Sequence, residues 1–245
     1  MKVVAIIQAR MGSSRLPGKV MMQLGGKVVL KRVVDRVAAA DGIDAIIVAT
    51  TNSSQDDVIA DFCKLQNFNC YRGEEDDVLE RYFQAAKFRK ADVIVRITAD
   101  CPLLDHEVLS DMVKVFKDMR ESGENIDYLR NSGFPRGLDV EIFTYQALAK
   151  ARSATKKDYE REHVTPYFYQ HPECFRLADY KSPVDQSNLR WTLDTPEDLA
   201  FICKVYAAFS DRDGAFSTSE IHELINRQPA IKMINAHIRQ KTLGE

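Results

Sequence analysis

Short apolar runs alternate with amphipathic segments through the first 120 residues of the chain. The runs are continuous, a pattern typical of strands covered on both faces, and the segments between them space their apolar residues as helices do. The predicted strands are Val3–Ile7, Ile43–Ala49, Asn69–Tyr71 and Val93–Ile97, and the predicted helices are Val29–Val37, Ser53–Leu65, Val78–Phe88 and one capped by Asp105 that runs to Phe116. This alternation predicts an α/β domain with a largely parallel sheet.

The pattern is less regular after residue 120. Strands are predicted at Ile126–Leu129, Leu138–Phe143, Phe175–Tyr180 and Leu189–Leu193, and helices at Asp158–Tyr169 and Pro196–Phe209. No proline- or serine-rich linker and no internal repeat divides the sequence. We therefore predict one domain over residues 1–245 with an irregular second half, in preference to two domains.

The composition narrows the class of protein. The 245 residues are 45% hydrophobic and 29% charged, as in ordinary globular proteins, and no apolar stretch has the length of a signal peptide core or a membrane span. We expect a cytoplasmic protein without a membrane partner. The formal net charge of −2 argues against a broad basic face for nucleic acid. The five cysteines form no C-x-x-C pair, so free, mostly buried thiols are expected.

The segment after the first predicted strand concentrates positive charge among small residues. Its cations, glycines and serines are Arg10, Gly12, Ser13, Ser14, Arg15, Gly18 and Lys19. Ligands of open α/β sheets bind at the carboxyl ends of the strands, where small residues let backbone N–H groups approach an anion. Guanidinium and ammonium groups bind phosphate oxygens. We therefore predict a phosphate site here; the alternative is a solvated basic loop that binds nothing.

Two well-known phosphate motifs do not match this loop. A Walker A motif has four residues between its glycines and a serine or threonine after its lysine. Here five residues separate Gly12 from Gly18, and Val20 follows Lys19. The G-x-G-x-x-G dinucleotide fingerprint is also absent from the sequence. The spacing therefore argues against both a P-loop protein and an NAD-binding Rossmann protein.

Two acidic residues lie at the ends of predicted strands. Asp100 follows the strand that ends at Ile97, at the sheet edge where the first loop is expected, and it suits a Mg²⁺ ion, which prefers carboxylate and phosphate oxygens. The alternative is that Asp100 only caps the turn before Pro102. The run Thr195-Pro196-Glu197-Asp198 has the pattern of a helix start, and this pattern leaves Asp194 without a structural role.

Three segments of the sequence together resemble a known family. Ala5–Lys19 closely resembles the opening of the sugar-acid cytidylyltransferases, which include the acylneuraminate and 3-deoxy-manno-octulosonate cytidylyltransferases. Asp100-Cys101-Pro102 resembles the family's Gly-Asp-x-Pro element, with Ala99 in place of the glycine, and Asp194–Leu199 matches its Asp-Thr-Pro-Glu-Asp-Leu run. The most similar branch is that of the SpsF-type proteins of polysaccharide biosynthesis. The resemblance implies the three-layer, Rossmann-like fold of nucleotide-diphospho-sugar transferases, and a homodimer.

The resemblance also implies roles for individual residues. Arg10, Arg15 and Lys19 are the cations expected to hold the triphosphate, and Asp100 and Asp194 are the carboxylates expected to hold Mg²⁺. The expected nucleotide-binding residues are Gln8, Ala9, Arg10, Gly12, Ser13, Arg15, Lys19 and Arg72, the last beside the base.

Three further residues are candidates for the sugar side of the site. Asp139 and Glu141 alternate along a predicted strand, so they share one face, which either contacts sugar hydroxyls or the metal, or is a polar outer face. His163 lies in a Glu-His element that resembles one in the SpsF-like branch. A structural role for this histidine is the alternative.

These features predict a Mg²⁺-dependent nucleotidyltransferase for surface polysaccharide or glycan biosynthesis. A hydroxyl of a sugar or sugar acid attacks the α-phosphorus of CTP, or of another nucleoside triphosphate, and pyrophosphate leaves. One alternative is a glycosyltransferase that consumes a nucleotide sugar, although three cations in one loop favour a triphosphate. The other is a non-catalytic nucleotide-binding subunit of such a pathway. The residues identify neither the acceptor sugar nor a general base.

Overall fold

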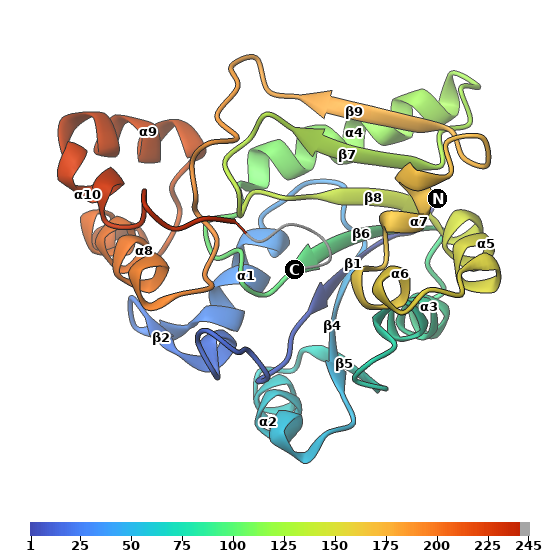
Figure 1. Ribbon diagram of the computed structural model, residues 1–245, viewed down its shortest axis with the longest axis horizontal. Helices are drawn as coiled ribbons and strands as arrows, with labels where there is room; N and C mark the ends of the chain where they lie inside the picture. The colour runs from blue at the N-terminus through green and yellow to red at the C-terminus, as the bar shows by residue number, and fades with distance from the viewer. Residues whose placement is uncertain (241–245) are drawn as a thin grey trace.

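A mixed sheet of seven strands forms the centre of the protein, and a two-stranded hairpin lies apart from it (Figure 1). The structure, a computed structural model, describes residues 1–240, so the last five residues of the predicted domain lie outside the described part. The strands are β1 (Val3–Gln8), β2 (Gln23–Leu24), β3 (Lys27–Val28), β4 (Ala45–Thr51), β5 (Asn69–Gly73), β6 (Val93–Thr98), β7 (Tyr128–Ser132), β8 (Glu141–Thr144) and β9 (Leu177–Lys181). The order in the large sheet is β5-β4-β1-β6-β8-β7-β9.

Only β8 runs against its neighbours within this sheet. It pairs antiparallel with β6 and β7, whereas the other four strand pairs are parallel. The predicted α/β class with a mostly parallel, mixed sheet is therefore confirmed. The carboxyl ends of β1 and β6 are adjacent, because Gln8 pairs with Thr98. This register brings the first loop and Asp100 to the same edge of the sheet.

Helices cover both faces of the sheet and make it the middle of three layers (Figure 1). The helices are α1 (Val29–Ala38), α2 (Asp57–Leu65), α3 (Val78–Arg89), α4 (His106–Glu121), α5 (Tyr145–Ala154), α6 (Asp158–His163), α7 (Pro166–Gln170), α8 (Pro196–Ala208), α9 (Thr218–Arg227) and α10 (Pro229–Met233), with short 3-10 turns at Lys19–Met21, Ser54–Asp56 and Ser210–Arg212. Alternate residues of β1 enter different cores: Val3 and Ala5 pack on the side of α1 and α4, and Val4 and Ile6 on the side of α3 and α5. The continuous apolar run is thus explained by burial of both faces.

A third apolar cluster lies at one end of the sheet. Helices α8, α9 and α10 gather there beside β2 (Figure 1). Trp191 is one of the largest fully buried side chains, and it packs with Phe201 of α8 and Ile221 of α9. This cluster anchors the segment that precedes α8, which carries Asp194.

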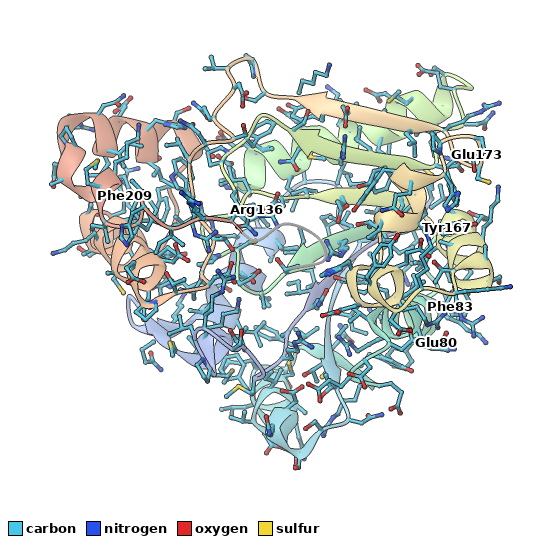
Figure 2. All side chains as sticks on the ribbon, viewed as in Figure 1. Glu80, Phe83, Arg136, Tyr167, Glu173 and Phe209 are labelled. Atoms are coloured by element: carbon cyan, nitrogen blue, oxygen red, sulfur yellow. The ribbon has the colours of Figure 1, made fainter. Side chains whose placement is uncertain are left out.

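Helix α5 was not predicted from the sequence. Its Arg152 pairs with Glu80 of α3 and lies over the ring of Phe83, at 4.5 Å from the ring centroid. Figure 2 labels Glu80 and Phe83, the two partners on α3. Thr144 caps the helix, since its hydroxyl accepts from the N–H of Ala147. The helix was missed because its apolar spacing is weak and its cap, Thr144, follows the predicted strand Leu138–Phe143 directly.

Several other predictions for the second half are wrong. Leu189–Leu193 is not a strand; it makes only an isolated bridge between Arg190 and Arg136. The single helix predicted at Asp158–Tyr169 is two short helices, because the backbone reverses at Val164. Strands β7 and β8 begin two and three residues later than predicted.

The structure also bears on the predictions about membrane spans and cysteines. No helix within residues 1–240 is both long enough and apolar enough to cross a membrane. The five cysteines are free, but only Cys63 and Cys101 are buried, and Cys203 is exposed, so the expected burial holds for a minority of them.

Candidate active site

The loop between β1 and Lys19 has a defined shape. Gly18 has φ +70°, a left-handed conformation that strains other residues, and a Cβ there would lie 3.2 Å from Cε of Met11. The N–H of Gly18 donates to the carbonyl of Met11 at 3.0 Å, and the N–H of Met11 donates to the buried carboxylate of Asp56 at 2.7 Å. The loop therefore folds back on itself and starts a 3-10 turn at Lys19.

Lys19 joins the two acids that the sequence singles out. Its Nζ lies 2.7 Å from Oδ2 of Asp100 and 2.7 Å from Oδ1 of Asp194. Arg15 approaches the same centre, with Nη2 at 3.2 Å from Oδ2 of Asp194. The hydroxyl of Thr98 donates to Oδ1 of Asp100 at 2.6 Å. Residues almost 180 positions apart thus meet in one charged cluster.

Opposing effects set the charge state of this cluster. Burial alone would lower the pKa of the Lys19 ammonium, but the adjacent carboxylates of Asp100 and Asp194 raise that pKa above its ordinary value. Burial would raise the pKa of Asp100, but Lys19 and the Thr98 hydroxyl keep that pKa below its ordinary value. Lys19 and Asp100 are therefore both charged at neutral pH.

The segment before α8 places Asp194 against Asp100. The N–H of Leu193 donates to the Asp100 carbonyl at 2.8 Å. Gly137 lies against the same segment with φ +106°, and a Cβ there would lie 2.5 Å from the backbone N of Thr192. Only glycine therefore allows this close approach.

The start of α8 forms a buried ionic group. Thr195 and Asp198 make the predicted capping box. Arg190 donates to both oxygens of Asp198 at 2.9 Å, and its Nη2 also lies 3.0 Å from Oδ2 of Asp194. The interpretation that Asp194 has no structural role is wrong, because Arg190 helps to hold it. Arg190 itself was not predicted as a site residue.

A cavity of about 360 Å³ lies over the first loop. Its walls carry most of the predicted nucleotide-binding residues together with both acids: Gln8, Arg10, Gly12, Ser13, Ser14, Arg15, Lys19, Val20, Thr98, Ala99, Asp100, His163 and Asp194. The Arg10 side chain has no hydrogen bond or ion pair within residues 1–240. The buried Oε1 of Gln8 also lacks a partner there. Both groups are available to a ligand.

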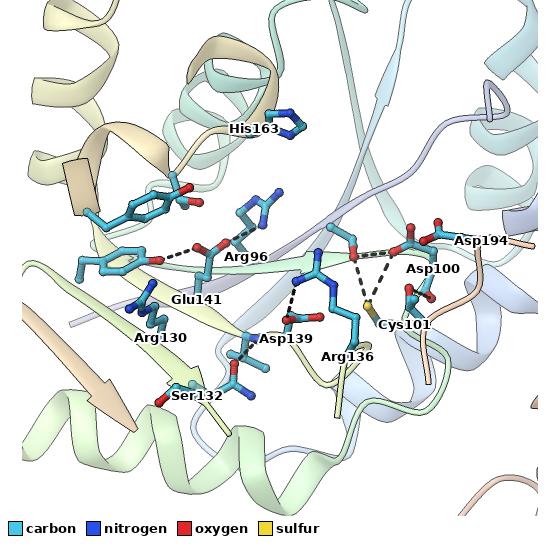
Figure 3. A pocket seen from close by; sticks show the side chains of 17 residues that line it. Arg96, Asp100, Cys101, Arg130, Ser132, Arg136, Asp139, Glu141, His163 and Asp194 are labelled. Carbon is cyan, nitrogen blue, oxygen red and sulfur yellow. Dashed lines mark hydrogen bonds and ion pairs between the residues drawn. The ribbon is translucent and has the colours of Figure 1, made fainter. Parts of the chain in front are cut away.

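A second cavity of about 550 Å³ lies beyond the two acids (Figure 3). Thr98, Asp100, His163 and Asp194 line both cavities. The larger cavity also contains the predicted residues Asp139 and Glu141. The two cavities therefore meet at the charged cluster.

Paired charges run across β6, β8, β7 and β9, and three of them, Arg96, Glu141 and Arg130, line the larger cavity. The strand registers pair Arg96 with Glu141, Glu141 with Arg130, and Arg130 with Asp179. Arg96 Nη1 lies 2.5 Å from Glu141, and Tyr128 donates its hydroxyl proton to the same carboxylate. Arg136 lies at the mouth, 3.1 Å from Asp139 (Figure 3).

Sequence reasoning missed the arginines of this cavity, Arg96, Arg130 and Arg136. Arg96 itself was a signal, because it is the one charged residue in the largely apolar strand Val93–Thr98. No comparable signal marks Arg130 or Arg136, since their positions follow from strand pairing.

Two predicted nucleotide-binding residues line neither of these cavities. Ala9 is buried, and its N–H donates to the Ala49 carbonyl at 3.1 Å. Arg72 donates to the carbonyls of Thr51 and Ser53 and pairs with Asp57 at 2.7 Å. The Arg72 guanidinium therefore supports the loop after β4 in this structure.

The acids fit a hard divalent cation. Asp100 and Asp194 present carboxylate oxygens to one common cation, the Lys19 ammonium. Residues 1–240 contain no group of three or more histidine, cysteine or acidic side chains suited to a metal. Two carboxylates are nevertheless what Mg²⁺ commonly takes from a protein, with phosphate oxygens and water as the remaining ligands.

Comparisons with known proteins identify the family of the chain. A protein-family model described as cytidylyltransferase matches residues 4–220. The chain is 34% identical to the spore coat polysaccharide biosynthesis protein SpsF of Bacillus subtilis over 93% of this chain and 95% of that protein. It is 37% identical to an uncharacterized protein of Methanocaldococcus jannaschii over 100% of this chain and 99% of that one.

One solved structure supports the same relationship. A cytidylyltransferase from Leptospira borgpetersenii superposes with a TM-score of 0.89, at 35% identity, over 99% of this chain and 100% of that one. The residues matched by the family model, 4–220, include the loop after β1, Asp100 and Asp194. The chain therefore belongs to the cytidylyltransferase family.

Proposed function

We propose that this cytidylyltransferase transfers the CMP part of CTP to a hydroxyl of a sugar acid for the synthesis of a surface polysaccharide or glycan. The observation that carries the proposal is the cluster of Lys19, Asp100 and Asp194 at the junction of two cavities. One cavity has the cations that a triphosphate needs, and the other has polar and charged side chains suited to an acidic sugar.

The smaller cavity is the proposed nucleotide site. Arg10, Arg15 and Lys19 would bind the β- and γ-phosphates and stabilise the negative charge that pyrophosphate carries as it leaves. Gly12 and Ser13 contribute a surface that a phosphate can approach closely, since a Cβ on Gly12 would meet nothing nearer than 3.6 Å. Gln8 offers its unpaired side-chain oxygen. Arg72 would reach the base only by releasing its present partners.

Asp100 and Asp194 are the proposed ligands of Mg²⁺. The bound ion would neutralise charge on the phosphates and orient them. The proposal is supported by the position of Lys19, whose ammonium lies between the two carboxylates and pairs with both. Arg190 and Thr98 hold the two carboxylates in place.

The larger cavity is the proposed acceptor site. Arg96, Arg130 and Arg136 provide donors for a carboxylate, whereas Asp139 and Glu141 accept from sugar hydroxyls. The mixture of charges suits an acceptor that carries both an acid and several hydroxyls. His163 lies between this cavity and the nucleotide site.

The reaction exchanges a phosphoanhydride bond of CTP for a phosphodiester bond to the acceptor. The acceptor oxygen forms a bond to the α-phosphorus while the bond from that phosphorus to the bridging oxygen of pyrophosphate breaks, and the acceptor proton is released. The protein contributes mainly by holding the two substrates in line and by placing cations around the triphosphate. The single domain over residues 1–245 and the homodimer stay predictions.

A pyrophosphate-release screen tests the proposed function. Purified protein with Mg²⁺ is assayed with each of the four ribonucleoside triphosphates against a panel of sugar acids that includes 3-deoxy-manno-octulosonate and N-acetylneuraminate. Pyrophosphate release that requires CTP and an acidic sugar is the expected result. Release of UDP or GDP from nucleotide sugars, without pyrophosphate from any pair, would instead indicate a glycosyltransferase.

A further inference from the structure

His163 occupies a special position between the two cavities. It is one of four residues that line both, and the other three, Thr98, Asp100 and Asp194, belong to the cluster around Lys19. Figure 3 shows its ring on the side of the cavity opposite Asp139, away from the acids. His163 therefore lies at the junction of the proposed nucleotide and acceptor cavities.

The backbone next to His163 has an unusual conformation. Val164 has φ 69° and ψ −53°, and the N–H of Thr165 donates to the carbonyl of His163 at 2.8 Å. This is a γ-turn of the strained form, which is rare for any residue and especially unfavourable for a β-branched one. Strained backbone of this kind persists where the surrounding structure enforces it, and it is common at functional sites.

The surroundings of the turn explain how it is enforced. The Val164 side chain is fully buried in the core under α3, α5 and α7, and its N–H donates to the Glu160 carbonyl at 3.1 Å. Pro166 starts α7 directly afterwards. Arg161 anchors α6 to α3 through Asp77. The turn ends α6 at His163 and places its imidazole at the cavity wall.

The His163 ring is free to accept a proton. Neither ring nitrogen has a hydrogen-bond partner within residues 1–240. Burial lowers its pKa below the ordinary value of 6.5, and the nearby Arg96 and Arg10 lower it further, against the opposing effect of Glu162. Asp77, the N-cap of α3, pairs with Arg161, and Glu80 in the first turn of α3 pairs with Arg152. The imidazole is therefore neutral at pH 7.

The carboxylates of the larger cavity are less suited to this task. Glu141 is bound by Tyr128 and Arg96. Asp139 accepts from Arg136 and from the N–H of Gly137 at 2.9 Å. A carboxylate whose oxygens already accept hydrogen bonds from neighbouring donors has fewer lone pairs free for the proton of an acceptor hydroxyl.

We propose that His163 is the general base of the reaction, held in place by the strained turn at Val164; this rests on the function proposed above. A ring nitrogen of His163 takes the proton of the acceptor hydroxyl as that oxygen bonds to the α-phosphorus. The bond to the bridging oxygen breaks, pyrophosphate leaves with the electron pair, and the imidazolium later returns its proton to solvent. No oxidant or further reactant is needed.

The test is the pH dependence of kcat for wild-type protein and His163→Gln, with CTP and the most active acceptor of the screen. In wild type, kcat falls as the pH drops below the pKa of His163, because the base becomes protonated. In His163→Gln, kcat at pH 7 is lower by about 10²-fold or more, and this acid limb is lost. Added imidazole partly restores turnover in His163→Ala.

A matched control separates chemistry from folding. His222 is also half-buried with a pKa lowered by burial, but it lines neither cavity and binds Gln186 at 2.9 Å. His222→Gln is expected to keep both kcat and the acid limb. We expect the dissociation constant of CTP, measured by calorimetry, to change less than about threefold in His163→Gln. This corresponds to a change of ~0.6 kcal/mol in the binding free energy.

Other outcomes would contradict either the general-base role or the proposed function. If His163→Gln keeps the wild-type kcat and acid limb, or if its main defect is a tenfold or greater loss of CTP affinity, the general-base role is wrong while the proposed function stands. If wild-type protein releases no pyrophosphate with any acceptor, the proposed function fails, and the general-base role with it.

Discussion

The two cavities of the site are built in different ways. The walls of the nucleotide cavity come largely from one continuous stretch, residues 8–20, completed by Asp100, Asp194 and His163. The acceptor cavity takes its walls from β6, β7, β8, the α6–α7 region and the segment before α8. The loop that forms the nucleotide cavity is determined locally, by a glycine and by backbone hydrogen bonds between residues close in sequence. The acceptor cavity depends instead on strand register and on close contact between segments distant in sequence.

This difference corresponds to two tasks: binding a triphosphate, which many enzymes share, and recognising one particular acceptor. A triphosphate presents similar oxygens to any enzyme that uses it, so one loop with fixed cations suffices. An acceptor must be recognised by its own pattern of hydroxyls and acids, which needs several elements brought together. We therefore expect substitutions on the two sides to affect different substrates, and substitutions at their junction to affect both.

The largest effect is expected at the junction. Asp100→Asn and Asp194→Asn should each lower kcat by about 10³-fold, because a metal ion held by carboxylates supplies several kcal/mol of charge stabilisation and each 1.36 kcal/mol is tenfold in rate. Pyrophosphate release measures the loss, and circular dichroism checks the fold. Asp35→Asn, which removes a partner of Lys31 on the surface, is the control and should keep full activity. Normal turnover in either junction variant rules out its role.

The next largest effect is on the free energy of unfolding, and it should differ between the two cavities. Gly137→Ala should lower the free energy of unfolding by about 3 kcal/mol, since a left-handed residue costs roughly 1–2 kcal/mol and overpacking roughly 1–3 kcal/mol. The cause is the 2.5 Å approach to the segment before α8.

Gly12→Ala in the nucleotide loop is the matched comparison. Its Cβ would meet nothing closer than 3.6 Å, so a change below about 0.5 kcal/mol is expected. Urea unfolding measures both variants. Equal stabilities would show that the close contact at Gly137 is not a constraint.

A smaller effect separates the substrates. Arg10→Ala should weaken CTP binding by about 10- to 100-fold with little change in the acceptor KM, because hydrogen bonds between charged groups contribute about 1.5–3 kcal/mol. Arg136→Ala should raise the acceptor KM by a similar factor and leave CTP binding unchanged. Arg227→Ala, on the exposed face of α9, is the control and should change neither. If Arg10→Ala and Arg136→Ala both weaken CTP binding and leave the acceptor KM unchanged, the assignment of the larger cavity to the acceptor is wrong.

The nucleotide side was largely predictable from the sequence because its signals are local. A continuous apolar run predicted β1, and the cations and glycines after it predicted the loop. Asp100 follows another such strand, and the capping box at Thr195 marked the start of α8. Six of the eight predicted nucleotide-binding residues therefore line the nucleotide cavity: Gln8, Arg10, Gly12, Ser13, Arg15 and Lys19.

The acceptor side was only partly predictable because its geometry depends on tertiary contacts. Asp139, Glu141 and His163 were identified and do line one cavity, but the arginines opposite them follow from strand pairing. The turn at Val164 contradicts local preference, so the helical pattern was extended across it. Leu189–Leu193 has the apolar pattern of a strand, yet its residues pack under α8 and α9 instead.

The central claim is that both cavities serve one transfer reaction at Asp100 and Asp194. Phosphorus NMR of CTP, Mg²⁺ and an accepted sugar acid tests this most directly, because it resolves the fate of all three phosphates. We expect one pyrophosphate for each new CMP–sugar phosphodiester, with neither product detected for Asp194→Asn. Formation of CDP and inorganic phosphate, or of pyrophosphate without a CMP–sugar product, would contradict it.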